Sequence, residues 1–115
     1  MRILIADHQA QVRFALRTLL GHQPGLEVVG EAATAGELVA QVGMTRPDLV
    51  LLHWRLSEAG QDLVQTLHQT CPGLRVLVLS ARPETRSDAL ASGADAFVCK
   101  MDSPEKLLEA IFGAV

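Results

Sequence analysis

The stretch DLVLLHWR, residues 48–55, decides the fold class because it holds four consecutive apolar residues, Leu49 to Leu52. A short continuous apolar run is typical of a strand that is buried on both faces of a parallel sheet. The run stops at His53, beside the only tryptophan of the chain, Trp54. A histidine at the end of a buried strand raises the question of what chemistry that position can support.

Similar apolar and β-branched runs occur on either side of this stretch, and each is followed by a segment with helical spacing of its apolar residues. The predicted strands cover residues 3–6, 26–29, 49–52, 74–79 and 96–99. Five units of strand then helix predict an α/β fold, in which helices cover both faces of one five-stranded parallel sheet.

Five helices are predicted, one after each strand. The first ends at Gly21, and the third spans about residues 61–68 after a loop over residues 55–61. The fourth spans residues 84–92 and ends at a glycine, and the last begins after Ser103.

Local sequence signals refine these helices. Thr34 and Glu37 form a capping-box pattern, in which hydroxyl and carboxylate each satisfy a free backbone N–H. Ser103, which precedes a proline, is typical of an N-cap. Arg13 and Arg17 are expected to face away from the apolar stripe of the first helix.

The composition predicts one globular domain over residues 1–115. The net charge of -3 comes from scattered residues, so we expect no nucleic-acid binding by this domain alone. No apolar run reaches the length of a membrane span and no signal-peptide pattern occurs, so we expect a cytoplasmic protein without a membrane partner. Cys71 and Cys99 form no Cys-x-x-Cys pair, which leaves a zinc or redox motif without support.

Polar residues follow the predicted strands at the points where these end. Asp7 and His8 follow the first strand, His53 the third, Ser80 the fourth and Lys100 the fifth. The carboxyl ends of parallel strands meet at one edge of a sheet, so we expect these side chains to share a shallow cleft. The turn after the first strand has no glycine and no Walker pattern occurs, which argues against a nucleotide-binding dehydrogenase or kinase.

Five blocks of the sequence carry a resemblance to a known family. They are RILIADHQAQVRFALRTLL, PDLVLLHWRL, VLVLSA, ASGADAFVCK and DSPEKLLEAI. In this order they resemble a bacterial response regulator receiver (CheY-like) domain, of the kind that heads LuxR/NarL-type transcriptional regulators. The resemblance implies a three-layer, flavodoxin-like doubly wound fold with strand order 2-1-3-4-5, and a role in two-component signal transduction, or phosphorelay, and transcription regulation.

The resemblance also implies a mechanism. In the family, two adjacent acids after the first strand help to hold Mg²⁺, and an aspartate after the third strand accepts a phosphoryl group from a histidine kinase. A hydroxyl and a lysine then bind the phosphoryl oxygens. Carried over by position, Asp7 is the first acid, Ser80 the hydroxyl, Lys100 the lysine and Phe97 the switch aromatic.

Two positions depart from the family pattern. His8 stands at the second acid, and His53 stands at the phosphoacceptor position. Imidazole is a poor ligand for Mg²⁺, so we expect no cofactor, with Mg²⁺ binding weak or absent. His53 also lacks the carboxylate oxygen that forms an aspartyl phosphate. Lys100 is expected to form an ion pair with Asp7.

The favoured hypothesis is an atypical, non-enzymatic receiver that acts through protein contacts without aspartate phosphorylation. We expect its partner to be a second copy, an attached output domain or another signalling protein. We also expect that the chain is a receiver cut from a longer protein with a C-terminal DNA-binding domain. One alternative is a transition-metal sensor that uses Asp7, His8 and His53. Adjacent residues in an extended chain point in opposite directions, which counts against it, but the family resemblance implies that both residues at this bend reach the metal. Another is a phosphotransfer-competent receiver with a different acceptor. A pH response of the histidines is less favoured than hydrogen bonding to loop backbone.

Overall fold

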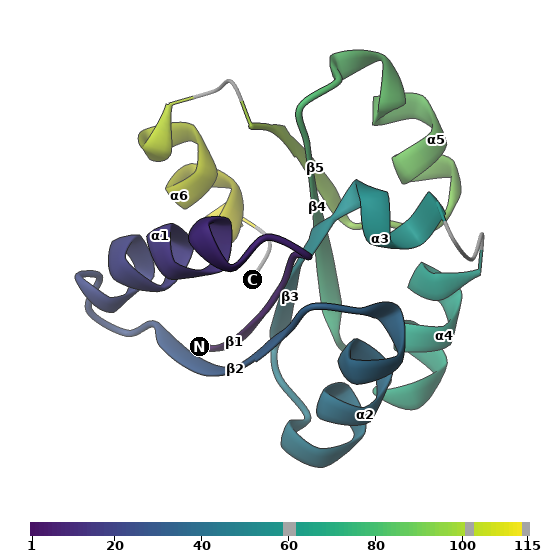
Figure 1. The fold of residues 1–115 in the computed structure, drawn as a ribbon, viewed down its shortest axis with the longest axis horizontal. Helices are drawn as coiled ribbons and strands as arrows, with labels where there is room; N and C mark the ends of the chain where they lie inside the picture. The colour runs from purple at the N-terminus through teal and green to yellow at the C-terminus, as the bar shows by residue number, and fades with distance from the viewer. Residues whose placement is uncertain (59–61, 101–102, 114–115) are drawn as a thin grey trace.

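Five parallel strands form one sheet in the order β2-β1-β3-β4-β5 (Figure 1). The structure, a computed structural model, describes residues 1–58, 62–100 and 103–113. The strands are β1 (Arg2–Ala6), β2 (Glu27–Ala32), β3 (Leu49–His53), β4 (Arg75–Ser80) and β5 (Ala96–Cys99). The predicted five-stranded parallel sheet is confirmed, and its strand order is that of the flavodoxin-like doubly wound fold.

Strand β3 lies in the middle of the sheet, between β1 and β4. Residues Leu49 to Leu52 are all buried, because helices cover both faces of the sheet at this strand. Only His53, the last residue of the strand, is partly exposed, at the carboxyl edge. The continuous apolar run therefore reflects a central strand, and its polar end marks where the sheet meets the solvent.

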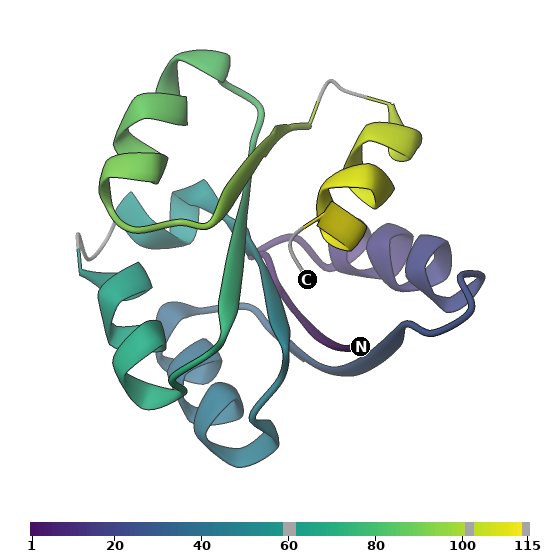
Figure 2. The ribbon, with the colours of Figure 1, turned by 180° about the vertical axis from the view of Figure 1, so that it is seen from behind.

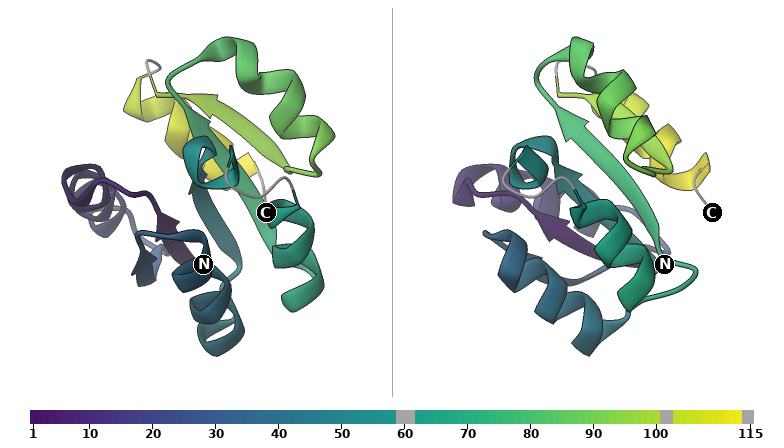
Figure 3. Two further views of the ribbon diagram at one scale, coloured as in Figure 1. Left: turned by 45° about the vertical axis from the view of Figure 1, so that its right-hand side comes forward. Right: turned by 90° about the vertical axis from the view of Figure 1, so that its right-hand side faces the viewer.

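The helices form two layers that sandwich the sheet. They are α1 (Ala10–Gly21), α2 (Ala35–Thr45), α3 (Trp54–Glu58), α4 (Leu63–Thr70), η1 (Pro83–Thr85), α5 (Arg86–Ala91) and α6 (Pro104–Gly113). Helices α1 and α6 lie side by side over one face, and α2, α4 and α5 cover the other (Figures 1 and 2). Figure 3 shows these layers from two further sides. Each helix in the described part of the chain is too short or too polar to cross a membrane.

Two apolar cores correspond to the two layers. One core joins Leu20 of α1 to Leu107 and Ile111 of α6, against one face of β1, β3 and β4. The other joins Leu38 of α2 and Leu67 of α4 to the opposite face. Burial on both faces of the strands supplies the main stabilising free energy, and it leaves the strand ends free to carry polar groups.

The segment after β3 differs from the prediction. A loop was predicted over residues 55–61, but Trp54 to Glu58 form the short helix α3. Trp54 and Leu56 pack against the core on the α2 and α4 side, and this packing stabilises a helix that is too short to form alone. Residues 59–61 lie outside the described residues, including the predicted start of the next helix, which the structure describes from Leu63.

The predicted starts of α2, after Thr34, and of α6, after Ser103, are confirmed with one change of detail. Helix α6 begins at Pro104, directly after Ser103. The Thr34 hydroxyl accepts a hydrogen bond from the Glu37 N–H at 3.1 Å, as the capping box requires. The Glu37 carboxylate, however, lies 3.4 Å from the Thr34 hydroxyl and accepts from it. The capping hydrogen bond from the Glu37 N–H is therefore present, and the Glu37 carboxylate bonds to the Thr34 side chain where a full capping box has a bond to the Thr34 backbone N–H.

Arg13 and Arg17 of α1, which were expected to face away from the apolar stripe, reach the edge strand β2. Arg13 Nε lies 3.2 Å from one carboxylate oxygen of Glu31, and an Arg17 guanidinium nitrogen lies 2.5 Å from the other. Arg13 also donates a hydrogen bond to the backbone carbonyl of Asp7 at 2.7 Å. These contacts hold α1 against β2 and connect both to the carboxyl end of β1.

Candidate functional site

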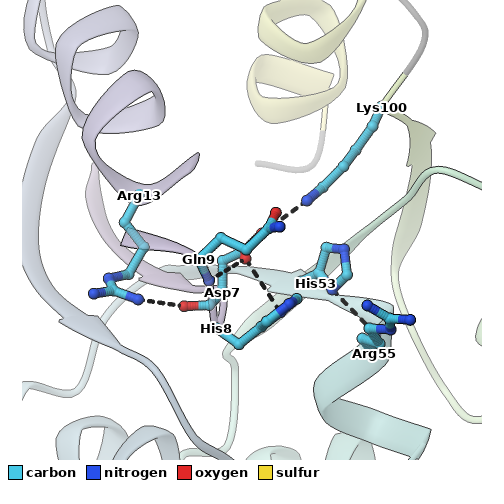
Figure 4. Close-up of polar contacts among 7 residues, drawn as sticks. All are labelled: Asp7, His8, Gln9, Arg13, His53, Arg55 and Lys100. Carbon is cyan, nitrogen blue, oxygen red and sulfur yellow. Dashed lines mark hydrogen bonds and ion pairs between the residues drawn. The ribbon is translucent and has the colours of Figure 1, made fainter. Parts of the chain in front are cut away.

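A cleft of about 440 Å³ opens at the carboxyl edge of the sheet. Its lining residues come from the segments that follow β1, β3, β4 and β5, and they are His8, Gln9, His53, Trp54, Arg55, Ser80, Ala81, Arg82 and Lys100. Asp7 does not line the cleft, but its carboxylate contacts His8 and Lys100 (Figure 4). The structure thus brings together all five polar residues that follow the predicted strands.

Asp7 is the buried charge of the site, with only 1% of its surface exposed. One carboxylate oxygen, Oδ1, accepts a hydrogen bond from the Gln9 N–H at 2.9 Å. The other oxygen, Oδ2, lies 2.8 Å from Lys100 Nζ, which is the predicted ion pair. A buried carboxylate is tolerated when charge-assisted hydrogen bonds replace its lost hydration, and here both oxygens have such partners.

His8 turns back toward Asp7. Its Nδ1 lies 3.5 Å from Asp7 Oδ1, although its side chain is 38% exposed. The expectation that adjacent residues diverge does not hold at this point, because strand β1 ends at Ala6 and the chain bends after it. The two side chains therefore meet just beyond the end of β1, as Figure 4 shows.

His53 lies across the cleft from His8, with the ring centroids 5.4 Å apart and the rings inclined at 60°. Its Nδ1 accepts a hydrogen bond from the Arg55 N–H at 3.2 Å (Figure 4). Burial lowers the pKa of His53 below its ordinary value of 6.5, and the positive charges of Lys100 and Arg55 act in the same direction, against the attraction of Asp7. The uncharged ring therefore carries its proton on Nε2.

Ser80 lies in a buried hydroxyl network at the end of β4. Its Oγ accepts from the Arg82 N–H at 3.1 Å and lies 2.9 Å from the Thr85 hydroxyl, which in turn lies 2.6 Å from the Arg82 carbonyl. Sequence reasoning missed Thr85, since a threonine in a helix start gives no signal of a contact made by the preceding loop. Gln9 and Arg55 were missed because they contribute backbone N–H groups, which no side-chain pattern reveals.

Phe97, the predicted switch aromatic, lies on β5 and packs against the core on the α2 and α4 side. The guanidinium carbon of Arg86 lies 5.8 Å from the centroid of its ring. A cation near an aromatic face at this distance is a weak favourable interaction. The pair joins β5 to helix α5.

The fold and the cleft together define a class of protein. A doubly wound sheet with a buried aspartate and a lysine paired at its carboxyl edge is the framework of a signalling receiver. The chain belongs to the response regulator receiver domains, a family that matches residues 3–112.

Two relatives that are similar in sequence are transcription regulators. The chain is 37% identical over 103 residues to the DNA-binding transcriptional activator DevR/DosR of Mycobacterium tuberculosis, covering 87% of the chain and 48% of the relative. It is 36% identical over 112 residues to the transcriptional regulatory protein YhcZ of Bacillus subtilis, covering 95% of the chain and 52% of the relative. The chain spans about half the length of these relatives.

Solved structures give the same family and fold. A two-component response regulator of the LuxR family from Aurantimonas superposes with a TM-score of 0.89 at 30% identity, covering 97% of this chain and 82% of that one. A response regulator domain of Thermotoga maritima CheB superposes with a TM-score of 0.87 at 24% identity, covering 99% of this chain and 95% of that one. The second likeness concerns the fold alone. The predicted receiver domain and its CheY-like fold are confirmed.

Proposed function

We propose that this receiver domain signals through protein contacts, without phosphorylation of an acceptor aspartate and without enzymatic activity. The observation that carries the proposal is His53, an imidazole at the end of β3 that faces the buried ion pair of Asp7 and Lys100. The acceptor position therefore has no carboxylate. An aspartyl phosphate, the product expected of the family, cannot form on this side chain.

The residues around His53 do not fit the Mg²⁺ that the family resemblance implies. Mg²⁺ prefers octahedral oxygen ligands, and these positions offer one carboxylate and two imidazoles. One oxygen of that carboxylate, Asp7 Oδ2, is held by the Lys100 ammonium at 2.8 Å. Phosphotransfer that depends on Mg²⁺ is therefore not part of the proposed function.

Phosphate transfer to His53 itself is also disfavoured. Its Nδ1 lone pair is engaged by the Arg55 N–H, and its Nε2 carries the proton in the uncharged ring. In this arrangement neither ring nitrogen has a free lone pair, and the donor set does not fit the Mg²⁺ that would neutralise the charge of the transferring group. These two features support a receiver without an acceptor over a receiver with a histidine acceptor.

Internal contacts join the segments that surround the cleft. The pair of Lys100 and Asp7 joins the end of β5 to the end of β1, and the hydroxyls of Ser80 and Thr85 hold the loop after β4. In the proposed function these groups stabilise one surface for a partner. Fixed side chains favour this role, because a preorganised surface loses little entropy on binding.

Apolar features on α1 and α6 support a protein as the partner. An apolar groove of about 460 Å³ lies between these helices. Phe14 on α1 and Phe112 on α6 are 72% and 50% exposed. Exposed apolar surface of this kind favours contact with another protein. Since DevR/DosR is a DNA-binding transcriptional activator, we infer a cytoplasmic role in transcription regulation, with an attached output domain, a second copy or another signalling protein as partner.

Phosphorylation by a small phosphodonor tests the proposal. We expect the purified chain to gain no phosphoryl group from acetyl phosphate and Mg²⁺ when its intact mass is measured. The control is the double variant His8→Asp and His53→Asp, which restores the acids to the same scaffold and is expected to gain one. Phosphoryl uptake by the wild-type chain overturns the proposal and establishes phosphotransfer to another acceptor.

A further inference from the structure

We propose that Asp7, His8 and His53 form a binding site for a transition-metal ion, with Zn²⁺ or Ni²⁺ as the best fit. The proposal goes beyond the proposed function, because it assigns a ligand to the cleft. It stands on the positions of the three side chains and does not depend on how the domain contacts its partner.

The three residues already lie at near-ligating distances. Each offers one ligand atom, and these atoms all lie within 4.8 Å of one another. Ligand bonds of about 2.0–2.1 Å in tetrahedral geometry place ligand atoms about 3.3 Å apart. Asp7 Oδ1 and His8 Nδ1, at 3.5 Å, already meet this spacing. A side-chain movement of about 1–1.5 Å brings the remaining donor, from His53, to the same spacing.

The donor set suits a borderline metal. Two imidazoles with one carboxylate are typical ligands of Zn²⁺, Ni²⁺ and Fe²⁺, whereas Mg²⁺ and Ca²⁺ select oxygen. Three protein ligands leave a coordination position for water. His8 and His53 line the cleft of about 440 Å³, which gives a hydrated ion a path to the site.

Lys100 opposes the metal. Its ammonium lies 2.8 Å from Asp7 Oδ2, on the carboxylate that the metal would share. Two cations near one carboxylate repel each other, so removal of the ammonium strengthens metal binding. An increase in metal affinity on loss of Lys100 cannot come from general damage to the fold, since such damage would weaken binding.

Metal binding also changes helix α3. The Arg55 N–H donates to His53 Nδ1 at 3.2 Å. If the metal binds Nε2, the proton of the ring moves to Nδ1, and if it binds Nδ1, it replaces the Arg55 N–H. In either case the hydrogen bond from Arg55 is lost. The site is thereby coupled to the first turn of α3, which follows His53 directly.

A second histidine–carboxylate pair provides a matched control. His68 Nε2 lies 3.1 Å from Asp95 Oδ2, closer than His8 Nδ1 lies to Asp7. Asp95 is also contacted by Arg75 and by the Val76 N–H. Within the described ranges, Asp7, His8 and His53 are the one set of three histidine, cysteine or acidic residues whose ligand atoms lie close enough together to hold one metal ion. A histidine beside a carboxylate is therefore not sufficient, and the variant His68→Gln should leave binding unchanged.

The experiment titrates the purified, chelator-treated chain with Zn²⁺ alone and with Ni²⁺ alone, without a phosphodonor, by isothermal calorimetry. We expect one equivalent to bind. His53→Gln and His8→Gln should each weaken affinity at least about tenfold. Loss of a hydrogen-bonding partner of a metal ligand already costs about 10–100-fold, and loss of the ligand itself should cost no less. His68→Gln should bind as the wild type does, and Lys100→Met should bind more tightly.

Two further readouts separate a ligand role from misfolding. Far-UV circular dichroism checks that each variant is folded, and the amide resonance of Arg55 should shift on metal addition in the wild type. Absence of binding in the wild type overturns the proposal, as does an equal loss in His68→Gln and His53→Gln, which indicates adventitious histidine binding. Neither result bears on phosphorylation, so this proposal and the proposed function fail independently.

Discussion

Lys100 Nζ lies 2.8 Å from Asp7 Oδ2, an ion pair that joins residues 93 positions apart in the sequence. Lys100 follows the edge strand β5 and Asp7 follows β1, so the pair crosses the end of β3 and β4. The carboxylate is almost fully buried, and its remaining oxygen accepts from the Gln9 N–H. The pair therefore compensates a charge inside the protein, unlike an exposed ion pair, which contributes little.

The variant Lys100→Met should reduce the free energy of unfolding by about 2 kcal/mol, because it leaves a buried carboxylate without its cation. Urea unfolding at neutral pH measures the loss. Asp7→Asn combined with Lys100→Met removes both charges and should recover part of it. If Lys100→Met and wild type unfold at the same urea concentration, the pair has no net stabilising role.

Thr85→Val should destabilise the domain by about 1–2 kcal/mol, since the buried Ser80 hydroxyl and the Arg82 carbonyl each lose a partner. The matched control is Thr18→Val, which removes an exposed hydroxyl that bonds the Phe14 carbonyl within α1. The control should change stability by less than about 0.5 kcal/mol. Equal effects of the two changes would show that burial of the network is irrelevant.

Stability should depend on pH through His53, whose pKa burial holds below 6.5. Well above pH 6.5 the ring is uncharged in both the folded and the unfolded chain, so this contribution is constant. As the pH falls below 6.5, the unfolded chain takes up the proton first, and the free energy of unfolding decreases until the folded ring also titrates.

Urea unfolding of the metal-free chain over a pH series measures this slope. His53→Gln should flatten it. His22→Gln, which changes an exposed ring bonded to the Thr18 carbonyl, should retain it. A wild-type slope that survives in His53→Gln assigns the pH dependence to other groups.

Mg²⁺ should distinguish the wild type from the double variant His8→Asp and His53→Asp. Two added carboxylates beside the buried Asp7 repel one another, and a hard cation relieves this repulsion. Mg²⁺ should therefore raise the melting temperature of the double variant and leave that of the wild type unchanged. A rise of equal size in the wild type, measured by differential scanning calorimetry, would show that the imidazoles of His8 and His53 do not prevent Mg²⁺ binding.

The sheet was predictable because its three inner strands, β1, β3 and β4, are buried along almost their whole length and have continuous apolar sequences. The strand at Leu49 to Leu52 can be recognised from its own residues, whereas helix α3 cannot. Its five residues are too few to show a helical period, and it depends on Trp54 and Leu56 packing against a core assembled from distant segments. Helix propensity alone does not stabilise so short a segment.

The candidate site divides in the same way. Strand ends converge in any parallel sheet, so the meeting of Asp7 with Lys100 could be predicted from topology. The direction of His8 was implied only by the family resemblance, because the alternation of side chains applies within a strand and this residue lies beyond the end of β1. The Arg55 N–H on His53 and the hydroxyl of Thr85 depend on local backbone geometry, which single residue types do not encode.

The contact of Arg13 with the Asp7 carbonyl has a consequence for solution conditions. Arg13 and Arg17 share the Glu31 carboxylate near the protein surface, where dissolved salt screens the attraction between charges over about 10 Å at 0.1 M. The backbone at Asp7 is therefore held by an arginine whose ion pair with Glu31 depends on ionic strength. High salt should weaken the support of this backbone, although the Asp7 carboxylate itself is buried.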